Sequence, residues 1–154
     1  MTSQSFGDAD LLAYMRGHKL AVVASVDATG RPQAALVGVG VADTFDIIFD
    51  TVSSSRKHAN LLADPRAAVT FSGPGERTLQ FEGVARPVST SDPADALWRE
   101  AYYAAWPDGR SRLTWEGLAY WRIEPRWLRF SDYDAGPLIV EKAFGRAERP
   151  RSNP

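Results

Sequence analysis

Short segments that are apolar, or that alternate between apolar and polar residues, occupy the first third of the chain and are typical of β-strands. Residues 19–26 are mainly β-branched and apolar, a turn sequence Asp-Ala-Thr-Gly-Arg-Pro follows, and residues 33–41 resume the apolar pattern. These two segments predict a hairpin. Residues 45–50 have Phe, Ile and Phe at alternate positions, which predicts that these side chains share a buried face and that Asp46 faces solvent.

The rest of the chain predicts further strands without a regular alternation of strand and helix. These strands are predicted over residues 66–72, 77–88, 118–124 and 127–131. The second of them is long enough to wrap around a barrel, and Gly83 stands where such a strand can bend. Pro125-Arg126 separates the last two strands.

Three short helices are predicted between these strands. The residues that start or stop them are Asp8 or Asp10 with Gly17, then Asp64-Pro65, then Ser91-Asp92-Pro93 with Trp106. Six to seven strands with so few helices predict a mainly β, antiparallel closed sheet with peripheral helices. A doubly wound parallel sheet is not expected.

Length, charge and composition limit the class of protein. The chain has 154 residues, so residues 1–154 are expected to form one domain, with its core over about residues 11–131 and a loose tail from Arg146. The net charge of −1 gives no overall field to attract nucleic acid or a membrane surface. Without Cys, and with two His, thiol chemistry and a metal site are not expected. The longest aliphatic run, residues 20–26, is too short to span a membrane, and a cytoplasmic location is expected.

The residue types that bind ligands are concentrated where a buried strand meets a helix, between residues 49 and 61. The hydroxyls of Thr51 and Ser55 come shortly before Arg56 and Lys57. The N-terminus of a helix favours an anion, and cations there are unfavourable unless an anion neutralises them. The pattern therefore predicts a phosphate site. The alternative is that Ser55 only caps the helix and that the two cations are solvated.

The run Phe49-Asp50-Thr51 followed by Ser55-Arg56-Lys57 resembles the flavin-phosphate segment of the pyridoxamine 5'-phosphate oxidase-like, FMN-binding split-barrel family. Other segments resemble that family in the same order, and they are residues 20–26, 30–33, 61–66, 82–85 and 122–125. The likeness covers about residues 11–131. It implies an antiparallel split β-barrel of six to seven strands.

The resemblance also implies, position by position, which residues hold FMN. The phosphate would be bound by Thr51, Ser55, Arg56 and Lys57. The ring would lie near the backbone of Leu36, Val37 and Gly38, and near Thr78, which stands where the oxidases have a glutamine. The family implies a homodimer with both flavin sites at the interface, and the resemblance leaves the catalytic residues unknown.

A stripe of small residues accompanies the implied ring site. By strand alternation, Gly38 and Gly40 share a face with Ala34 and Leu36. Glycine in a strand lets another backbone or a flat ligand approach closely, and it also serves barrel curvature. Both readings remain open from the sequence.

The chain departs from the true oxidases at several positions. Ala35 and Gly40 replace an arginine and a lysine that bind the cofactor, and Ser131 replaces a tryptophan. No histidine follows His58, so the Arg-x-His-Asp-Arg element for the vitamin B6 substrate is missing. We therefore expect an FMN-binding flavoprotein that acts as an oxidoreductase on another small-molecule substrate or electron donor. His58 itself is given no role.

Three alternatives are considered. A deazaflavin coenzyme would need an exposed basic groove, which Arg77 and Arg86 could form. A non-catalytic protein that stores or senses flavin would use the same site. Haem is disfavoured because the family's haem binders use a histidine near the C-terminus.

Candidates for the rim of the site or for an interface are Trp106, Trp115, Arg110 and Arg112.

Overall fold

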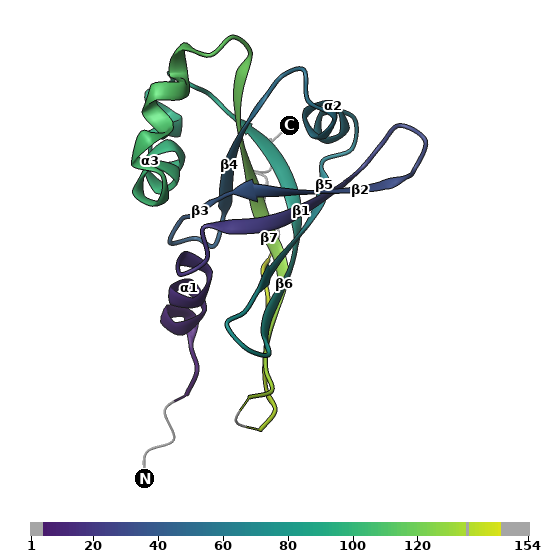
Figure 1. The fold of residues 1–154 in the computed structure, drawn as a ribbon, viewed down its shortest axis with the longest axis vertical. Coiled ribbons are helices and arrows are strands. Elements are labelled where there is room, and N and C mark those ends of the chain that lie inside the picture. The colour runs from purple at the N-terminus through teal and green to yellow at the C-terminus, as the bar shows by residue number, and fades with distance from the viewer. Residues whose placement is uncertain (1–4, 135, 146–154) are drawn as a thin grey trace, which may run out of the picture.

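The computed structural model describes residues 5–134 and 136–145 of the chain. Within them, eight strands form one antiparallel sheet and three α-helices lie around it (Figure 1). The strands are β1 (Leu20–Val26), β2 (Pro32–Gly38), β3 (Gly40–Val41), β4 (Ile47–Val52), β5 (Arg66–Ser72), β6 (Arg77–Val88), β7 (Leu118–Asp132) and β8 (Leu138–Ala143). The helices are α1 (Asp8–Arg16), α2 (Arg56–Ala63) and α3 (Ala96–Ala105), with the short 3-10 helices η1 (Pro93–Asp95) and η2 (Pro107–Thr114).

The sheet curls into a split barrel around its two long central strands. The strand order is β2-β1-β5-β6-β7-β4-β3, and β8 pairs with β7. The register of β6 against β7 shifts between Glu82 and Gly83, where a Cβ on Gly83 would collide with the carbonyl oxygen of Glu124. The predicted bend at Gly83 and the antiparallel, mainly β barrel are both confirmed.

Strand β7 passes through Pro125 without a break, so the prediction of two separate strands there is wrong. Gly83 pairs with Pro125 while Glu82 pairs with Trp127, which leaves Arg126 as the extra residue of a bulge. A bulge interrupts the ladder of backbone hydrogen bonds and therefore tolerates a proline. β8, which the sequence analysis did not predict, pairs along the second half of β7.

Two hydrophobic cores use the two faces of β4. Phe45, Ile47 and Phe49 are all buried in the barrel interior, as their alternation predicts, together with Leu11 and Met15 of α1. The second core lies between α3 and the opposite face of the strands, and its buried members are Ala42, Ile48, Val88, Tyr102, Tyr103 and Tyr120. Because α3 covers that face of the sheet (Figure 1), these residues are shielded from solvent.

The ends of some elements differ from the predictions. Gly7 caps α1 in place of Asp8 or Asp10, and its N–H donates to the Asp10 carboxylate at 2.8 Å. Residues 33–41 divide at Val39, because β2 pairs with β1 whereas β3 pairs with β4. β4 extends to Val52, so Thr51 lies in a strand and not in a loop. The tail from Arg146 lies outside the described residues.

Candidate functional site at the start of α2

The start of α2 brings together three of the four residues predicted to hold a phosphate. Ser55 caps the helix, its Oγ accepting the N–H of His58 at 3.2 Å. The Thr51 and Ser55 hydroxyl oxygens are 2.9 Å apart, and Lys57 Nζ donates to Thr51 Oγ1 at 3.4 Å. Since β4 ends at Val52 and α2 begins at Arg56, the short connection holds the two hydroxyls and the ammonium group in one cluster.

Arg56 and Lys57 form no ion pair with a carboxylate in the part of the chain that the structure describes, although Asp27 lies close enough to Arg56 for that positive charge to help lower the pKa of the Asp27 carboxyl. Arg56 is exposed, Lys57 is half-buried, and neither forms an ion pair there. The first turn of α2 contains no acidic residue. Two cations at the positive end of a helix dipole are unfavourable by themselves and favourable beside an anion. The arrangement is therefore suited to a phosphate.

A small cavity of about 180 Å³ opens beside the two cations. Its other walls are Val23, Ser25, Gln33, Ala34 and Ala35 of β1 and β2. Arg can bind two phosphate oxygens through its fork, and Lys adds a point charge. The cavity therefore joins the cationic helix start to the strand that carries the predicted ring residues.

Asn60, which the sequence analysis did not select, fixes α2 against this strand pair. Its side-chain amide donates to Ser25 Oγ at 3.0 Å and to Gln33 Oε1 at 2.9 Å, and Asn60 and Ser25 are both buried. A buried amide with two partners defines a position more sharply than apolar packing does. Nothing local in the sequence distinguishes Asn60 from a surface helix residue.

His58 is engaged in the structure of the barrel. The buried indole N–H of Trp121 donates to His58 Nδ1 at 3.0 Å, and the two rings meet edge to face. Because Nδ1 accepts this bond, the neutral ring carries its hydrogen on Nε2. The contact anchors the first turn of α2 to β7.

The predicted ring residues lie on β2, but the glycine stripe is partly covered. Leu36 is 64% exposed. At Gly38 the indole of Trp106 lies 2.8 Å from where a Cβ would stand, and its N–H donates to the carbonyl of Val39 at 3.2 Å. At Gly40 a Cβ would lie 2.5 Å from the carbonyl oxygen of Ala101 in α3. At both glycines the group that approaches closely is another part of this chain. The sequence left open whether these glycines allow a close approach or serve barrel curvature, and at Gly40 the structure shows the close approach of another backbone.

Thr78 is not brought to α2. It pairs with Ser72 at the end of β5 that is remote from α2, and with Ser131 of β7. Its neighbour Leu79 is buried in the barrel interior, so strand alternation directs Thr78 to the outer face of the sheet. Within one chain, Thr78 is thus separate from the phosphate cluster.

The rim candidates from the sequence analysis include a buried polar cluster beneath η2. Arg112 Nε donates to Asp50 Oδ2 at 2.7 Å, and its terminal nitrogen donates to the Tyr102 hydroxyl at 2.7 Å. Tyr103 and Tyr120 share a hydrogen bond of 2.9 Å. Burial raises the pKa of the Tyr102 and Tyr120 hydroxyls, so both stay protonated at neutral pH. Arg112 thus fastens η2 to β4, whereas Trp115 is 57% exposed.

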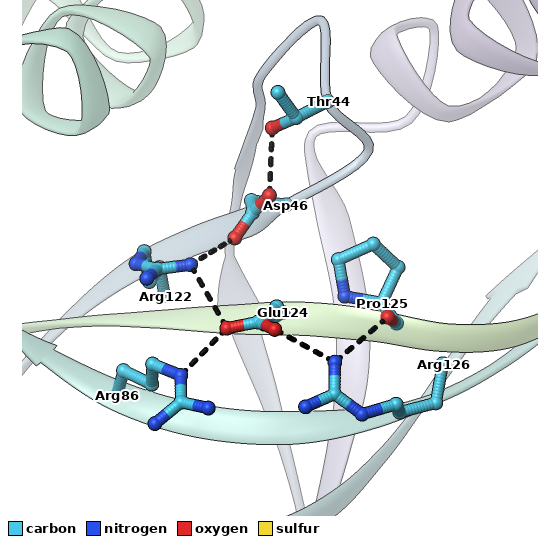
Figure 2. Close-up of polar contacts among 7 residues, drawn as sticks. All are labelled: Thr44, Asp46, Arg86, Arg122, Glu124, Pro125 and Arg126. Carbon is cyan, nitrogen blue, oxygen red and sulfur yellow. Dashed lines mark hydrogen bonds and ion pairs between the residues drawn. The ribbon is translucent and has the colours of Figure 1, made fainter. Parts of the chain in front are cut away.

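A second polar cluster corrects the expectation that Asp46 faces solvent. Asp46, which directly precedes β4, is 3% exposed; its carboxylate binds Arg122 at 2.6 Å and accepts from the Thr44 hydroxyl at 2.6 Å (Figure 2). Arg122 in turn lies 4.5 Å from the ring centroid of Trp98. The aspartate therefore belongs to the architecture of the outer core.

Glu124 joins three arginines in this cluster (Figure 2). It lies 2.6 Å from Arg86, 2.8 Å from Arg126 and 3.5 Å from Arg122. Burial alone would raise the pKa of Glu124, but the hydrogen bonds from Arg126 and Arg86 outweigh burial and hold the pKa below its usual range. Arg77 is similarly paired with Asp132 at 3.0 Å. Arg77 and Arg86 therefore do not form an unpaired basic groove.

The fold and the candidate site together define a class of protein. It is an antiparallel split barrel in which the N-terminus of a helix offers a site that favours an anion. The sequence model of the family described as pyridoxamine 5'-phosphate oxidase matches residues 8–132. A pyridoxine/pyridoxamine 5'-phosphate oxidase from Bordetella avium (strain 197N) is 36% identical over an alignment of length 142, and the match covers 82% of this chain and 67% of that protein. The chain belongs to the pyridoxamine 5'-phosphate oxidase family.

Solved structures share the fold at low sequence identity. A pyridoxamine 5'-phosphate oxidase-related, FMN binding protein from Nostoc punctiforme matches with a TM-score of 0.63 and 15% identity, over 94% of this chain and 99% of that one. A heme binding protein from Mycobacterium smegmatis matches with a TM-score of 0.72 and 17% identity, over 88% and 56%. Among the described residues, no helix has the length and apolarity needed to cross a bilayer.

Proposed function

We propose that this chain binds FMN through its phosphate at the start of α2, and that it is a flavin-dependent oxidoreductase for a small-molecule substrate or electron donor. The observation that carries the proposal is the pair of cations, Arg56 and Lys57, which form no ion pair within residues 5–134 and 136–145 and stand at the start of α2 with the hydroxyls of Thr51 and Ser55. These four donors match the needs of a phosphate dianion, which accepts several charge-assisted hydrogen bonds.

The isoalloxazine ring would extend from the phosphate along β2, past the backbone of Leu36, Val37 and Gly38. FMN, when bound, supplies the redox chemistry, and the protein positions the ring and controls access to it. The cavity beside Arg56 and Lys57 already reaches Ala34 and Ala35 on that strand. On the Trp106 side of Gly38 the indole excludes a flat ligand, so the ring would approach β2 from the other side or from its exposed edge.

A homodimer would complete this site. Leu20, Val22 and Leu36 are 53%, 39% and 64% exposed, and Val22 pairs directly with Leu36 across β1 and β2. Adjacent exposed apolar side chains on one sheet face are typical of a protein interface. Cross-strand pairing places Thr78 on this same outer face, so a second copy docked there could bring its Thr78 toward the ring site.

The three alternatives are a deazaflavin coenzyme, haem and flavin storage, and the structure bears on each of them differently. The pairing of Arg77 and Arg86 with carboxylates removes the basic groove that a longer deazaflavin coenzyme would need. Neither His18 nor His58 lines the cavity beside Arg56 and Lys57, and neither side chain is exposed, which gives haem binding at this site no support. Flavin storage would use the proposed site and differs only in lacking turnover.

The proposal is tested by titrating the purified protein with FMN and following the quenching of flavin fluorescence. We expect saturable binding of one FMN per chain at micromolar concentrations, with FMN preferred over the deazaflavin coenzyme in competition. The absence of binding at these concentrations would contradict the flavin site. Stopped-flow reduction by NAD(P)H and reoxidation then separate an oxidoreductase, which turns over rapidly, from a storage protein, which does not.

A further inference from the structure

A row of four hydrogen-bonded polar side chains connects the turn between β1 and β2 to α2. Asp27 Oδ2 accepts from Gln33 Nε2 at 3.3 Å, and Gln33 Oε1 accepts from Asn60 Nδ2 at 2.9 Å. Asn60 Nδ2 also donates to Ser25 Oγ at 3.0 Å. The row therefore ties strand β2 to the helix whose first turn carries the two cations of the proposed phosphate site.

Gln33 is the member of this row that presents a long polar side chain to the cavity beside Arg56 and Lys57. Ser25 also lines that cavity, whereas the other two members of the row do not. The next two residues of β2 on the cavity wall are alanines, whose side chains end at Cβ and offer no donor. The half-buried Gln33 is thus the residue through which β2 can offer a side-chain hydrogen bond to a ligand held by the cations.

The two partners of Gln33 fix which way its amide faces. Hydrogen bonds from the Arg31 N–H and the Thr29 hydroxyl hold the pKa of the Asp27 carboxyl below its usual range, so this group is ionised at neutral pH and can only accept. Gln33 Nε2 therefore faces Asp27, and Oε1 faces the Asn60 amide. A primary amide has two N–H groups, and within the described residues Nε2 has Asp27 as its one partner. The second N–H of Gln33 is consequently available to a ligand in the cavity.

We propose that Gln33 binds the phosphate of the ligand, with the second Nε2–H donating to a phosphate oxygen on the β2 side of the cavity. Arg56 and Lys57 would hold the same phosphate from the helix side. Asp27 and Asn60 are positioning residues in this arrangement, because they hold the amide with its donor available to the ligand. The inference rests on the proposed FMN function for the identity of the ligand, a phosphate monoester.

The first test compares FMN with riboflavin in the original protein, in Gln33→Leu and in Gln33→Glu, with flavin fluorescence as the readout. Leu keeps most of the side-chain bulk without the donor, so Gln33→Leu should weaken FMN by about three- to ten-fold, as for one neutral hydrogen bond, and change riboflavin by less than about two-fold. Gln33→Glu places a negative charge beside the phosphate and should weaken FMN more than Gln33→Leu does. A role limited to holding β2 against α2 would instead weaken both flavins equally.

The second test detects the contact itself and needs no flavin. In isotope-labelled protein, heteronuclear NMR shows the Gln33 side-chain amide as a pair of N–H signals, which are identified by their loss in Gln33→Leu. Inorganic phosphate should shift this pair and leave the amide signals of Gln80 in place, because Gln80 lies on β6 and does not line the cavity.

Three results would overturn the proposal. They are Gln33 signals that phosphate leaves unchanged, an FMN affinity in Gln33→Leu that stays within about two-fold of the original, and equal losses for FMN and riboflavin. Failure of FMN to bind the original protein, with the phosphate-dependent shift of Gln33 intact, would instead remove the flavin function and leave Gln33 as a phosphate-binding residue.

Discussion

Two groups of cations on this barrel differ in what surrounds them. Arg86, Arg122 and Arg126 converge on Glu124, and Arg122 also binds the buried Asp46 (Figure 2). Arg56 and Lys57 stand at the start of α2 with hydroxyl neighbours and no ion pair in the described residues. Every arginine of the first group is paired with a carboxylate, whereas neither cation of the second group forms an ion pair among the described residues.

The difference does not come from a shortage of acidic residues. The chain has 19 Asp and Glu against 18 Lys and Arg, and most of the arginines named above are paired. Cations left unpaired where the helix dipole is already positive lower the stability of the free protein, and they become favourable once an anion binds. The Glu124 cluster therefore serves the fold, whereas the α2 cluster is the candidate site for a ligand.

The largest expected effect is on the structural group. Asp46→Ala removes the 2.6 Å partner of the mostly buried Arg122 and leaves it only the 3.5 Å contact with Glu124, so we expect the free energy of unfolding to fall by about 3 kcal/mol. Urea denaturation followed by tryptophan fluorescence measures this. A loss below about 1 kcal/mol would mean that Arg122 is already solvated and that the contrast between the two groups is overstated.

Glu124→Gln should have an intermediate effect that depends on pH. Because the folded pKa of Glu124 is lowered, its stabilising contribution is present above the ordinary glutamate range near about 4.3 and is lost as pH falls through the lower folded value. We expect the substitution to cost about 2 kcal/mol at pH 7 and much less in acid. Unfolding curves recorded from neutral to acidic pH check this, and an equal loss at every pH would contradict the assignment.

The smallest stability effect is expected at α2. Arg56→Gln removes an exposed cation from a positive helix end, so stability without ligand should stay within about 0.5 kcal/mol of the original or rise slightly. Adding inorganic phosphate should stabilise the original protein more than this variant. Thermal unfolding with and without phosphate measures the difference, and equal stabilisation of both proteins would argue against an anion site.

Local signals in the sequence predicted much of the barrel. The strands over residues 66–72 and 77–88 have the predicted limits, since turn residues bound both and Gly83 marks the bend. Strand alternation predicts only that the Asp46 side chain points away from the face that Ile47 occupies. It does not tell whether that other face is exposed to solvent or covered. The burial of Asp46 depends on Arg122, far along the chain, which pairs with the Asp46 carboxylate and lies against Trp98 of α3.

In the candidate site, too, some features follow from neighbouring residues in the sequence and others depend on distant ones. Thr51, Ser55 and Lys57 are close in sequence, and their cluster was predictable from the strand-to-helix junction. Asn60 bonding to Ser25 and Trp106 covering Gly38 join residues far apart in the chain, and no local pattern distinguishes them. Sequence reasoning therefore found the charge of the site and missed the contacts that hold it in position.

The central claim is that Lys57 recognises a phosphate. Its most direct test compares FMN with riboflavin, which lacks the phosphate, in the original protein and in Lys57→Ala, with Lys142→Ala as the matched lysine control. A charge-assisted contact is worth about 1.5–3 kcal/mol, so Lys57→Ala should weaken FMN by roughly ten-fold to over a hundred-fold and change riboflavin by less than about two-fold. FMN affinity that stays within two-fold in Lys57→Ala, or equal losses for FMN and riboflavin, would contradict the account.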